Sequence, residues 1–391
     1  MQIDRNYNVL DLFRGRVYLA RMPRLSHDPH AKNQPHRHAE RGRGAVSNAD
    51  GRYERLQRDA FDDGWDNSID NTMPIETIVL PEWPKTIISR NKSPDISFDQ
   101  SINPYRGCEH GCIYCYARPN HAYVGLSPGL DFETKLFFKQ DAPALLEREF
   151  AKASYRPRTI MLGGVTDIYQ PIERTYRITR ALLEVMAHWR HPAAMITKSQ
   201  LIMRDIDVIA PMAERNLAKA AISITTLDRR IARKMEPRAA APHRRLEAVR
   251  ALSNAGVPVA VMVAPIIPAL NDNEIETILA AAADAGAREA GYVLLRMPLE
   301  IKELFREWLD AHFPDRAAKV IAQVRDMRGG RDYDPEWSQR QRGKGPLAEL
   351  IAQRFAQACR RYGLNGARAV LDHTQFQRPG GQNGQGELFG G

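Results

Sequence analysis

Short apolar segments alternate with longer amphipathic ones from residue 99 to 300, and this alternation restricts the fold more than any other feature. The apolar segments lie at 101–106, 159–164, 194–199, 219–226, 258–268 and 290–298. Several of them, such as VAVMV and YVLL, are apolar on both faces, which is typical of parallel strands covered by helices. Right-handed βαβ crossovers wind such strands into a barrel or an open sheet. Six units are fewer than the eight of a closed barrel, so we predict an α/β fold with a partial, open (βα)6 TIM-like barrel.

The segments outside this core differ from it in composition. Residues 1–60 lack a helical or strand period, and we expect a flexible basic N-terminal extension there. Residues 61–98 contain a β-like stretch interrupted by proline, which predicts an irregular arm packed on the 99–300 core. Amphipathic helices are predicted over 301–365 as a helical C-terminal extension, and the Gly- and Gln-rich residues 366–391 are expected to be disordered.

The charge and hydropathy patterns restrict the partners. The chain has 56 Lys and Arg against 47 Asp and Glu, a net charge of +9. This excess favours a polyanion such as nucleic acid, although solvated basic tails would account for it as well. No apolar run approaches the roughly 18–20 residues that cross a bilayer, and the first residues contain no signal-peptide core. We therefore expect a cytoplasmic protein with no membrane partner.

Three of the four cysteines lie within eight residues, in the segment INPYRGCEHGCIYCYARPNHAY. Thiols crowded together in a reducing compartment indicate a metal or cluster site rather than a disulfide. Cys108, Cys112 and Cys115 could hold three irons of a [4Fe–4S] cube and leave the fourth iron open. Gly107 and Gly111 each precede a cysteine, and glycine lets a loop wrap tightly around an inorganic core.

Other interpretations of these thiols remain open. The loop could be a structural zinc site with His110 or Cys359 as the fourth ligand, although zinc sites usually use paired CxxC units. The chain could also be an iron–sulfur protein that binds nucleic acid or senses redox state without radical catalysis. Cys359 shares a helix face with Ile351 and Phe355, which predicts a buried, inert thiol.

The CxxxCxxC motif, with the aromatic Tyr114 just before its last cysteine, resembles the signature of the radical S-adenosylmethionine (SAM) enzymes. The fold of that family is a partial (βα)6 barrel, in agreement with the six units counted above. Over about residues 95–300, segments such as SINPYRGCEHGCIYCYARP, TDIYQPIE, ITKS and MVAPIIPALND resemble the subgroup related to spore photoproduct lyase, a DNA-repair enzyme.

The resemblance implies two cofactors and an activity. Cys108, Cys112 and Cys115 would bind a [4Fe–4S] cluster whose free iron chelates SAM, and Tyr114 would lie against the adenine. An external one-electron donor of the flavodoxin or ferredoxin type would reduce the cluster. SAM would then be cleaved to a 5′-deoxyadenosyl radical that abstracts a hydrogen atom from a substrate, which could be a nucleic acid.

Residues after the predicted second strand match the GGE-type motif of the family. Gly163 and Gly164 would present backbone acceptors to the methionyl ammonium of SAM. Valine replaces the glutamate of that motif, and Asp167 is the nearest carboxylate. Asp167, Gln170 and Glu173 would either face the substrate or cap the next helix.

Three further residues are candidate SAM contacts. Lys198 ends the predicted third strand and Ser223 lies in the fourth, and both match positions at which the lyase contacts SAM. Arg238 could bind the methionyl carboxylate as a bidentate fork or could cap a helix. Lys198 and Ser223 could equally be a solvated lysine and a serine that satisfies a backbone group.

One position argues against photoproduct repair, and we identify no catalytic residue from the sequence. In the lyase, a cysteine after the second strand returns a hydrogen atom to the thymine radical. Aligning Thr166 and Asp167 with the Ser-Asp of the lyase puts Gly164 at the place of that cysteine. Glycine offers no hydrogen donor, so we expect a lyase-like radical enzyme with a different reaction.

Overall fold

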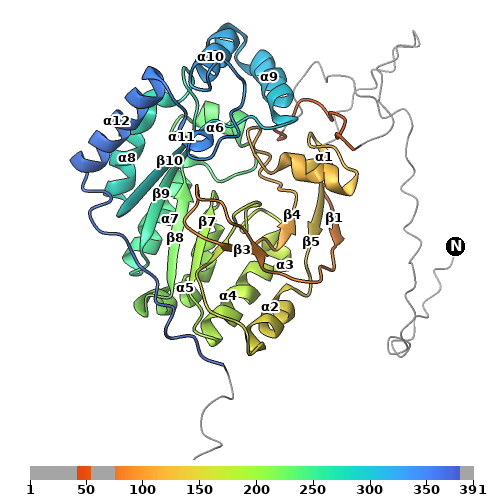
Figure 1. Cartoon of the computed structure of the whole chain (residues 1–391), viewed down its shortest axis with the longest axis vertical. Helices are drawn as coiled ribbons and strands as arrows, with labels where there is room; N and C mark the ends of the chain where they lie inside the picture. Colours follow the sequence, from red (N-terminus) through yellow and green to blue (C-terminus); the bar gives the residue numbers. More distant parts are fainter. Residues whose placement is uncertain (1–41, 54–74, 379–391) are drawn as a thin grey trace, which may run out of the picture.

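The computed structural model describes residues 42–53 and 75–378. Its central sheet contains β2 (Ser89–Arg90), β3 (Gln100–Ile102), β6 (Ile160–Leu162), β7 (Ala193–Thr197), β8 (Ala218–Ser223), β9 (Val259–Ile266) and β10 (Glu289–Leu294). The strand order is β10-β9-β8-β7-β6-β3-β2 (Figure 1). All pairs are parallel except that of β2 with β3. The sheet ends at β10 and β2, so it is an open sheet.

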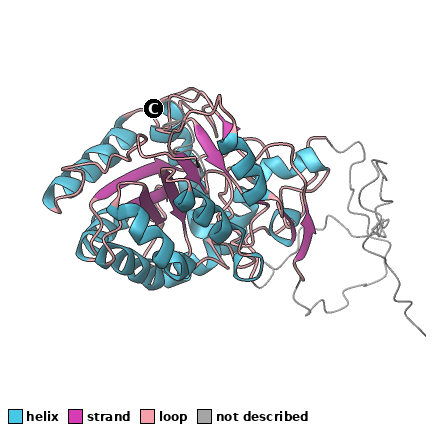
Figure 2. Cartoon of the chain, turned by 90° about the horizontal axis from the view of Figure 1, so that it is seen from below, coloured by secondary structure: helices cyan, strands magenta, loops and turns pink. Residues whose placement is uncertain are grey.

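Helices connect the parallel strands and cover one face of the sheet (Figure 2). The covering helices are α2 (Ala142–Ala151), α4 (Ile178–His188), α5 (Ile206–Glu214), α7 (Pro242–Asn254) and α8 (Ile275–Asp284). Shorter elements lie in the connections, namely α3 (Glu173–Tyr176), α6 (Arg229–Met235) and the 3-10 helices η1 (Arg118–Val124), η2 (Gln200–Asp205) and η3 (Asp272–Glu274). Side chains such as Ile102, Leu162 and Val261 are fully buried, while alternate positions of β9 are only partly buried, so the two faces of this strand differ. The predicted α/β fold with six βα units in a partial barrel is confirmed.

A smaller sheet contains β1 (Ile78–Pro81), β4 (Tyr105–Arg106) and β5 (Lys135–Phe138), in the order β1-β5-β4, next to α1 (Asp131–Thr134). The segment 101–106, predicted as one strand, is divided between the two sheets. Pro104 separates the parts, because it cannot donate to a strand ladder. The side chain of Asn103 instead accepts a hydrogen bond from the Val165 amide at 2.8 Å.

The C-terminal part is helical, as predicted. It contains α9 (Ile301–His312), α10 (Pro314–Asp326), α11 (Gln339–Arg342) and α12 (Pro346–Arg361). Helix α12 packs on α8, while α9 and α10 share a second apolar core with Ile113 and Tyr114 (Figure 1). In the described ranges, no helix has the length and apolar character needed to cross a membrane.

Two segments expected to be flexible or disordered are packed where the structure describes them. Residues 43–47 are buried at the side of the barrel that carries α1 and α9 (Figure 1). Residues 364–378 run back along the sheet, where the Asp372 amide donates to the Asn216 carbonyl at 2.8 Å. The parts of the predicted segments that lie outside the described residues are 1–41, 54–74 and 379–391.

Polar contacts span the open side of the barrel, between the loop before β3 and the loop after α10. The Ser338 amide donates to Asp95 Oδ1 at 2.5 Å, and Arg340 donates to the Asp95 carboxylate and, at 2.6 Å, to Ser93 Oγ. Helix α11, which carries Arg340, packs on β10. We call Ser93, Asp95, Ser338 and Arg340 the latch, because they join the two ends of the open sheet.

Candidate cofactor site

The cysteine loop, residues 107–118, begins at the end of β4 and leads into η1. The Gly111 amide donates to the Cys108 carbonyl and the Cys115 amide to the Cys112 carbonyl, each at 3.2 Å. Burial raises the pKa of all three thiols, that of Cys112 to about 12. After burial, Asp167 and the two other cysteines raise the pKa of Cys108 further, so the three sulfurs lie within electrostatic reach of one another. A metal must therefore displace protons when it binds here.

The loop needs glycine at two positions. Gly107 and Gly111 have φ values of 74° and 65°. A Cβ on Gly107 would lie 2.6 Å from Leu136 Cδ2, and one on Gly111 would lie 2.6 Å from Glu133 Oε2. Both the backbone conformation and the space therefore restrict these positions to glycine. The loop is a tight cradle in which His110 contacts Asp167 and Glu109 pairs with Arg238, and the three thiols are a donor set that suits an iron–sulfur cluster.

The zinc alternative gains no support from the arrangement. Among the described residues, no group of three or more His, Cys, Asp or Glu is placed to hold one metal ion. A [4Fe–4S] cluster does not require its ligands to converge on one metal ion, because each cysteine binds a different iron. Nδ1 of His110 lies 3.3 Å from Asp167 Oδ2. Cys359 is buried on α12, where Asn365 Nδ2 is 3.6 Å from its sulfur.

Asp167 ties the cysteine loop to the end of β7. Its carboxylate contacts His110 and accepts hydrogen bonds from the Lys198 amide at 2.7 Å and from Thr197 Oγ1 at 2.6 Å. Burial raises the pKa of Asp167, but His110 and these hydrogen bonds outweigh burial and hold that pKa well below its usual range. Asp167 therefore stays ionised while it supports the loop.

Arg238 and Gln170 also bind the cysteine loop. Arg238 Nη2 donates to Glu109 Oε1 at 3.0 Å, and its side chain is 39% exposed. The Gln170 amide group accepts from the Glu109 backbone at 2.9 Å and donates to the Gly107 carbonyl at 3.2 Å. Gln170 thus binds the backbone on both sides of Cys108, the first cysteine of the loop.

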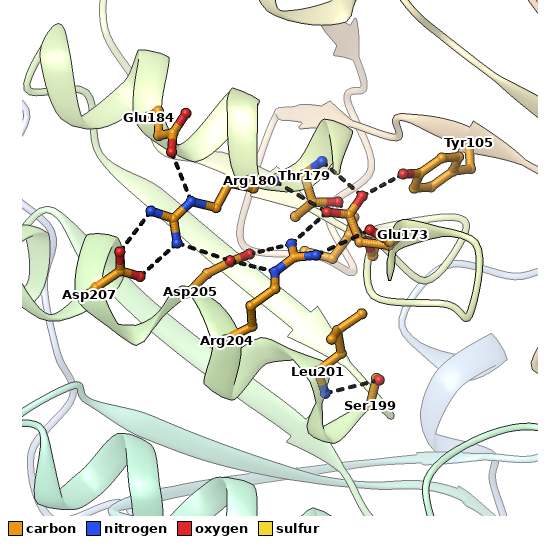
Figure 3. A network of polar contacts seen from close by, with 11 residues as sticks. Tyr105, Glu173, Thr179, Arg180, Glu184, Ser199, Leu201, Arg204, Asp205 and Asp207 are labelled. Atoms are coloured by element: carbon orange, nitrogen blue, oxygen red, sulfur yellow. Dashed lines mark hydrogen bonds and ion pairs between the residues drawn. The ribbon is translucent and has the colours of Figure 1, made fainter. Parts of the chain in front are cut away.

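Glu173 caps a helix, which was one of the two alternatives predicted for it (Figure 3). Its buried carboxylate accepts from the Thr179 amide at 3.0 Å, pairs with Arg204 at 2.7 Å and accepts from the Tyr105 hydroxyl. Helices α3 and α4 meet here at Arg177, which adopts a φ of 52°. The Glu173 side chain then supplies the acceptor that the first turn of α4 needs.

Tyr114 and Lys198, which are 84 positions apart in the chain, are neighbours in the structure. Lys198 Nζ lies 5.7 Å from the centroid of the Tyr114 ring. The Tyr114 hydroxyl donates to the buried carboxylate of Glu236. Burial raises the pKa of Glu236, but Arg245 and Lys198 outweigh burial and lower that pKa to about 2. A cationic and aromatic pair therefore stands beside the thiols.

Gly163 and Gly164 follow β6 and differ in their surroundings. Gly163 has a φ of 88°, and its Cβ would lie 2.5 Å from the Ile196 carbonyl oxygen. A Cβ on Gly164 would meet nothing closer than Phe98, at 3.6 Å. The Gly164 carbonyl accepts a hydrogen bond from the half-exposed Tyr116 hydroxyl. Only the first of the two glycines is required by its surroundings.

Two buried ion pairs near the site were not recognised from the sequence. Arg245 pairs with Glu236 and also donates to the Ser223 carbonyl at 3.1 Å, so that Ser223 lies at the edge of this network. Arg118 pairs with Glu133 beneath the cysteine loop. In a sequence such residues look like solvated surface charges, and only their position among apolar neighbours could have indicated burial.

Comparison with known proteins agrees with this arrangement. Residues 102–282 match the family model of the radical SAM superfamily. An uncharacterized protein of Mycobacterium tuberculosis strain H37Rv is 32% identical over 268 residues, which cover 67% of this chain and 77% of that protein. An uncharacterized protein of Methanocaldococcus jannaschii is 25% identical over 214 residues, which cover 55% of this chain and 76% of that protein.

Solved structures show the same fold. Spore photoproduct lyase complexed with dinucleoside spore photoproduct has a TM-score of 0.53 and 15% sequence identity, and the match covers 73% of this chain and 80% of the lyase. The cysteine loop at the end of the strands is thus set in a fold that the lyase shares. The chain belongs to the radical SAM superfamily of enzymes, which use a [4Fe–4S] cluster and SAM.

Proposed function

We propose that Cys108, Cys112 and Cys115 ligate the cluster. The support is the glycine-dependent cradle that holds three thiols. When bound, the cluster and SAM together supply one-electron chemistry that removes a hydrogen atom from an unreactive C–H bond. Burial raises the pKa of Cys115, and the Ala117 backbone, Arg118 and Lys198 oppose that shift only in part, so this thiol must lose its proton when iron binds.

SAM would lie between the loop and the ends of β6, β7 and β8. The proposed contacts are Tyr114, Gly163, Gly164, Lys198, Ser223 and Arg238. Tyr114 offers a flat face and Lys198 a positive charge. A carbonyl oxygen has two lone pairs, so the Gly163 and Gly164 carbonyls can accept from an ammonium group, the latter in addition to its hydrogen bond from Tyr116. Arg238 is partly exposed and can turn from Glu109 to a carboxylate.

For the substrate, we propose a nucleic acid. The observation that carries this proposal is a cluster of aromatic rings and guanidinium groups beside Gly164. The guanidinium of Arg296 lies 5.4 Å from the Tyr116 ring centroid and 3.5 Å from the Tyr333 hydroxyl. Trp337, which is 53% exposed, lies 5.8 Å from the Arg340 guanidinium. Stacking rings interleaved with cations are typical of single-strand binding.

Measurements of oligonucleotide binding and of SAM cleavage together test whether the substrate is a nucleic acid. Anaerobically loaded protein is titrated with labelled single-stranded DNA and RNA, and 5′-deoxyadenosine is measured with and without each oligonucleotide. We expect binding that weakens with salt, a substrate-dependent increase in 5′-deoxyadenosine, and weaker binding for Tyr116→Ala and Arg296→Ala. Trp83→Ala is the control, because Trp83 is an exposed aromatic residue that takes no part in this cluster. If an acidic peptide, and neither oligonucleotide, increased 5′-deoxyadenosine, the nucleic-acid proposal would be wrong.

The reaction we propose is not photoproduct repair, because Gly164 supplies no thiol at the position aligned with the lyase cysteine. DNA that carries the photoproduct, given with SAM and a reductant, should yield 5′-deoxyadenosine without restoring thymines. Efficient multiple-turnover repair would contradict this. The proposal includes a cytosolic location and a flavodoxin- or ferredoxin-type electron donor, since free clustered thiols need a reducing compartment.

A further inference from the structure

A short segment from outside the matched domain lies directly against the cysteine loop. We call residues 43–49 the strap. The Gly44 and Ala45 amides donate to the Glu133 carboxylate at 2.9 and 2.8 Å. Arg43 Nη1 donates to the Glu133 carbonyl oxygen at 3.0 Å. At this end of the strap, three hydrogen-bond donors therefore bind one buried residue, Glu133.

Glu133 connects the strap to the cysteine loop through Arg118. The Arg118 guanidinium pairs with Glu133 and donates to the carbonyls of Cys112 at 2.9 Å and Gly111 at 3.1 Å. It also donates to the carbonyls of Pro128 and Gly129. Both members of the pair are fully buried, and a buried pair is stable only when its remaining donors and acceptors are satisfied. The Gly44 and Ala45 amides of the strap supply the remaining hydrogen bonds to the Glu133 carboxylate.

The other end of the strap is held equally closely. The side chain of Asn48 donates to Asp131 Oδ1 at 3.1 Å and accepts from the Asp131 amide at 3.0 Å. The Leu130 amide donates to the Ser47 carbonyl at 3.3 Å, and Ser47 Oγ donates to Glu307 on α9 at 2.5 Å. The strap thus joins the residues beneath the cysteine loop to the C-terminal helices.

The strap approaches the loop so closely that one position admits no side chain. A Cβ on Gly44 would lie 1.8 Å from the carbonyl oxygen of Gly111. That carbonyl is in the loop, one residue before Cys112, and is also an acceptor of Arg118. Any displacement of the strap is therefore transmitted to the peptide that carries the second cysteine.

We propose that the strap is a clamp that holds the cysteine loop in its cluster-binding conformation, with Gly44 as a positioning residue. The proposal rests on the ligand assignment of the preceding section. It extends the cluster site to residues that precede the matched range 102–282. Loss of the strap contacts would leave Glu133 with fewer donors and would release Gly111 and Cys112.

The test compares Gly44→Ala with Gly42→Ala. Gly42 lies in the same segment and has a φ of 79°, but a Cβ there would meet nothing within 4 Å. We measure iron and acid-labile sulfide, the rate of cluster loss to a chelator, and the electron paramagnetic resonance spectrum of the reduced cluster. For Gly44→Ala we expect cluster loss roughly 10- to 100-fold faster than in the wild type and an altered spectrum, with Gly42→Ala unchanged in both. Equal cluster retention in Gly44→Ala and the wild type would overturn the proposal.

Two further measurements separate a clamp from a folding defect and from a wrong ligand assignment. In the protein without cluster, hydrogen exchange at the amides of Gly111, Ile113 and Cys115 should accelerate in Gly44→Ala, while the amides of β8 and β9 stay protected. Acceleration throughout the chain would mean general unfolding and would also overturn the proposal. Cys112→Ala reports on the ligand assignment alone: if it kept a normal cluster, the assignment would fail whatever the strap does.

Discussion

The two sides of the barrel mouth differ in how deeply their polar and aromatic groups are buried. On the cofactor side, the cysteine loop rests on the buried pair of Arg118 and Glu133, and its glycines leave no space for side chains. On the side of Tyr116 and Arg296, Tyr116 is 46% exposed, and Nε of Arg296 is buried without a hydrogen-bond partner. The cofactor side is mostly buried, although Nδ1 of His121 also has no partner there, whereas the other side has an exposed ring face and a donor that a ligand could use.

This difference indicates that the chain fixes the positions of its cofactors before the substrate binds. A cluster and SAM need fixed positions, because small displacements change reactivity greatly. Exposed rings and guanidinium groups can instead adapt to a larger substrate. Mutations on the cofactor side should therefore affect cofactor content and stability, while mutations of Tyr116 or Arg296 should affect substrate binding alone. The following predictions test that division.

The largest effect is expected at the cluster ligands. Cys108→Ala, Cys112→Ala or Cys115→Ala should each abolish the brown [4Fe–4S] chromophore or make it labile, as measured by absorbance and by iron analysis. The matched control is Cys359→Ala, which removes a buried thiol on α12 and should leave the cluster intact. Loss of the cluster in Cys359→Ala with retention in Cys115→Ala would contradict the assignment.

Substitution of two adjacent glycines should change the free energy of unfolding to very different degrees. Gly163→Ala combines a φ of 88° with a 2.5 Å approach to Ile196, so it should lower the free energy of unfolding by roughly 3 kcal/mol. Gly164→Ala meets only ordinary contacts at 3.6 Å, so the change should stay within about 0.5 kcal/mol. Chemical denaturation of both variants measures this, and equal losses would contradict the inference that only Gly163 is required by its surroundings.

SAM affinity should depend on the neighbouring Tyr114 and Lys198. Tyr114→Ala and Lys198→Ala should retain iron, but each loses one contact worth about 1–3 kcal/mol, hence roughly 5- to 150-fold in affinity. Equilibrium binding of SAM to the loaded protein is the measurement. Arg296→Ala serves as the comparison from the other side and should bind SAM normally. Unchanged binding in both of the first two variants would exclude them from the SAM site.

Acid should weaken the cofactor side through His121, which is buried in η1 against Phe132. Burial lowers the pKa of His121 to about 4, although its hydrogen bond to Lys135 opposes that shift. The unfolded chain takes up a proton near pH 6.5 and the folded protein does not, so stability falls as the pH decreases from about 6.5 to 4. From pH 7 to 5 the loss is up to about 2 kcal/mol. A His121→Gln variant should show a smaller loss in urea unfolding, and an identical pH dependence would contradict this account.

The strands could be predicted from the sequence better than the site. Apolar runs with helices between them leave few topologies, so the six parallel strands were predicted close to their observed positions. The division at Pro104 was not predicted, because an apolar run does not reveal which sheet each half joins. The cysteine motif indicated the loop, but not the strap, since Gly44 and Glu133 are 89 positions apart. Contacts between such distant polar residues leave no periodic signal in a sequence.

The latch closes the barrel wall mainly through side-chain contacts, unlike the connections between neighbouring strands. Neighbouring strands are held by ladders of main-chain hydrogen bonds, whereas the loop between β2 and β3 is linked across the opening to helix α11, which packs on β10, through the side chains of Asp95 and Arg340. The ring of the wall is therefore closed by the side-chain contacts of one carboxylate instead of a strand ladder. A change at Asp95 would remove this closure without the loss of a strand.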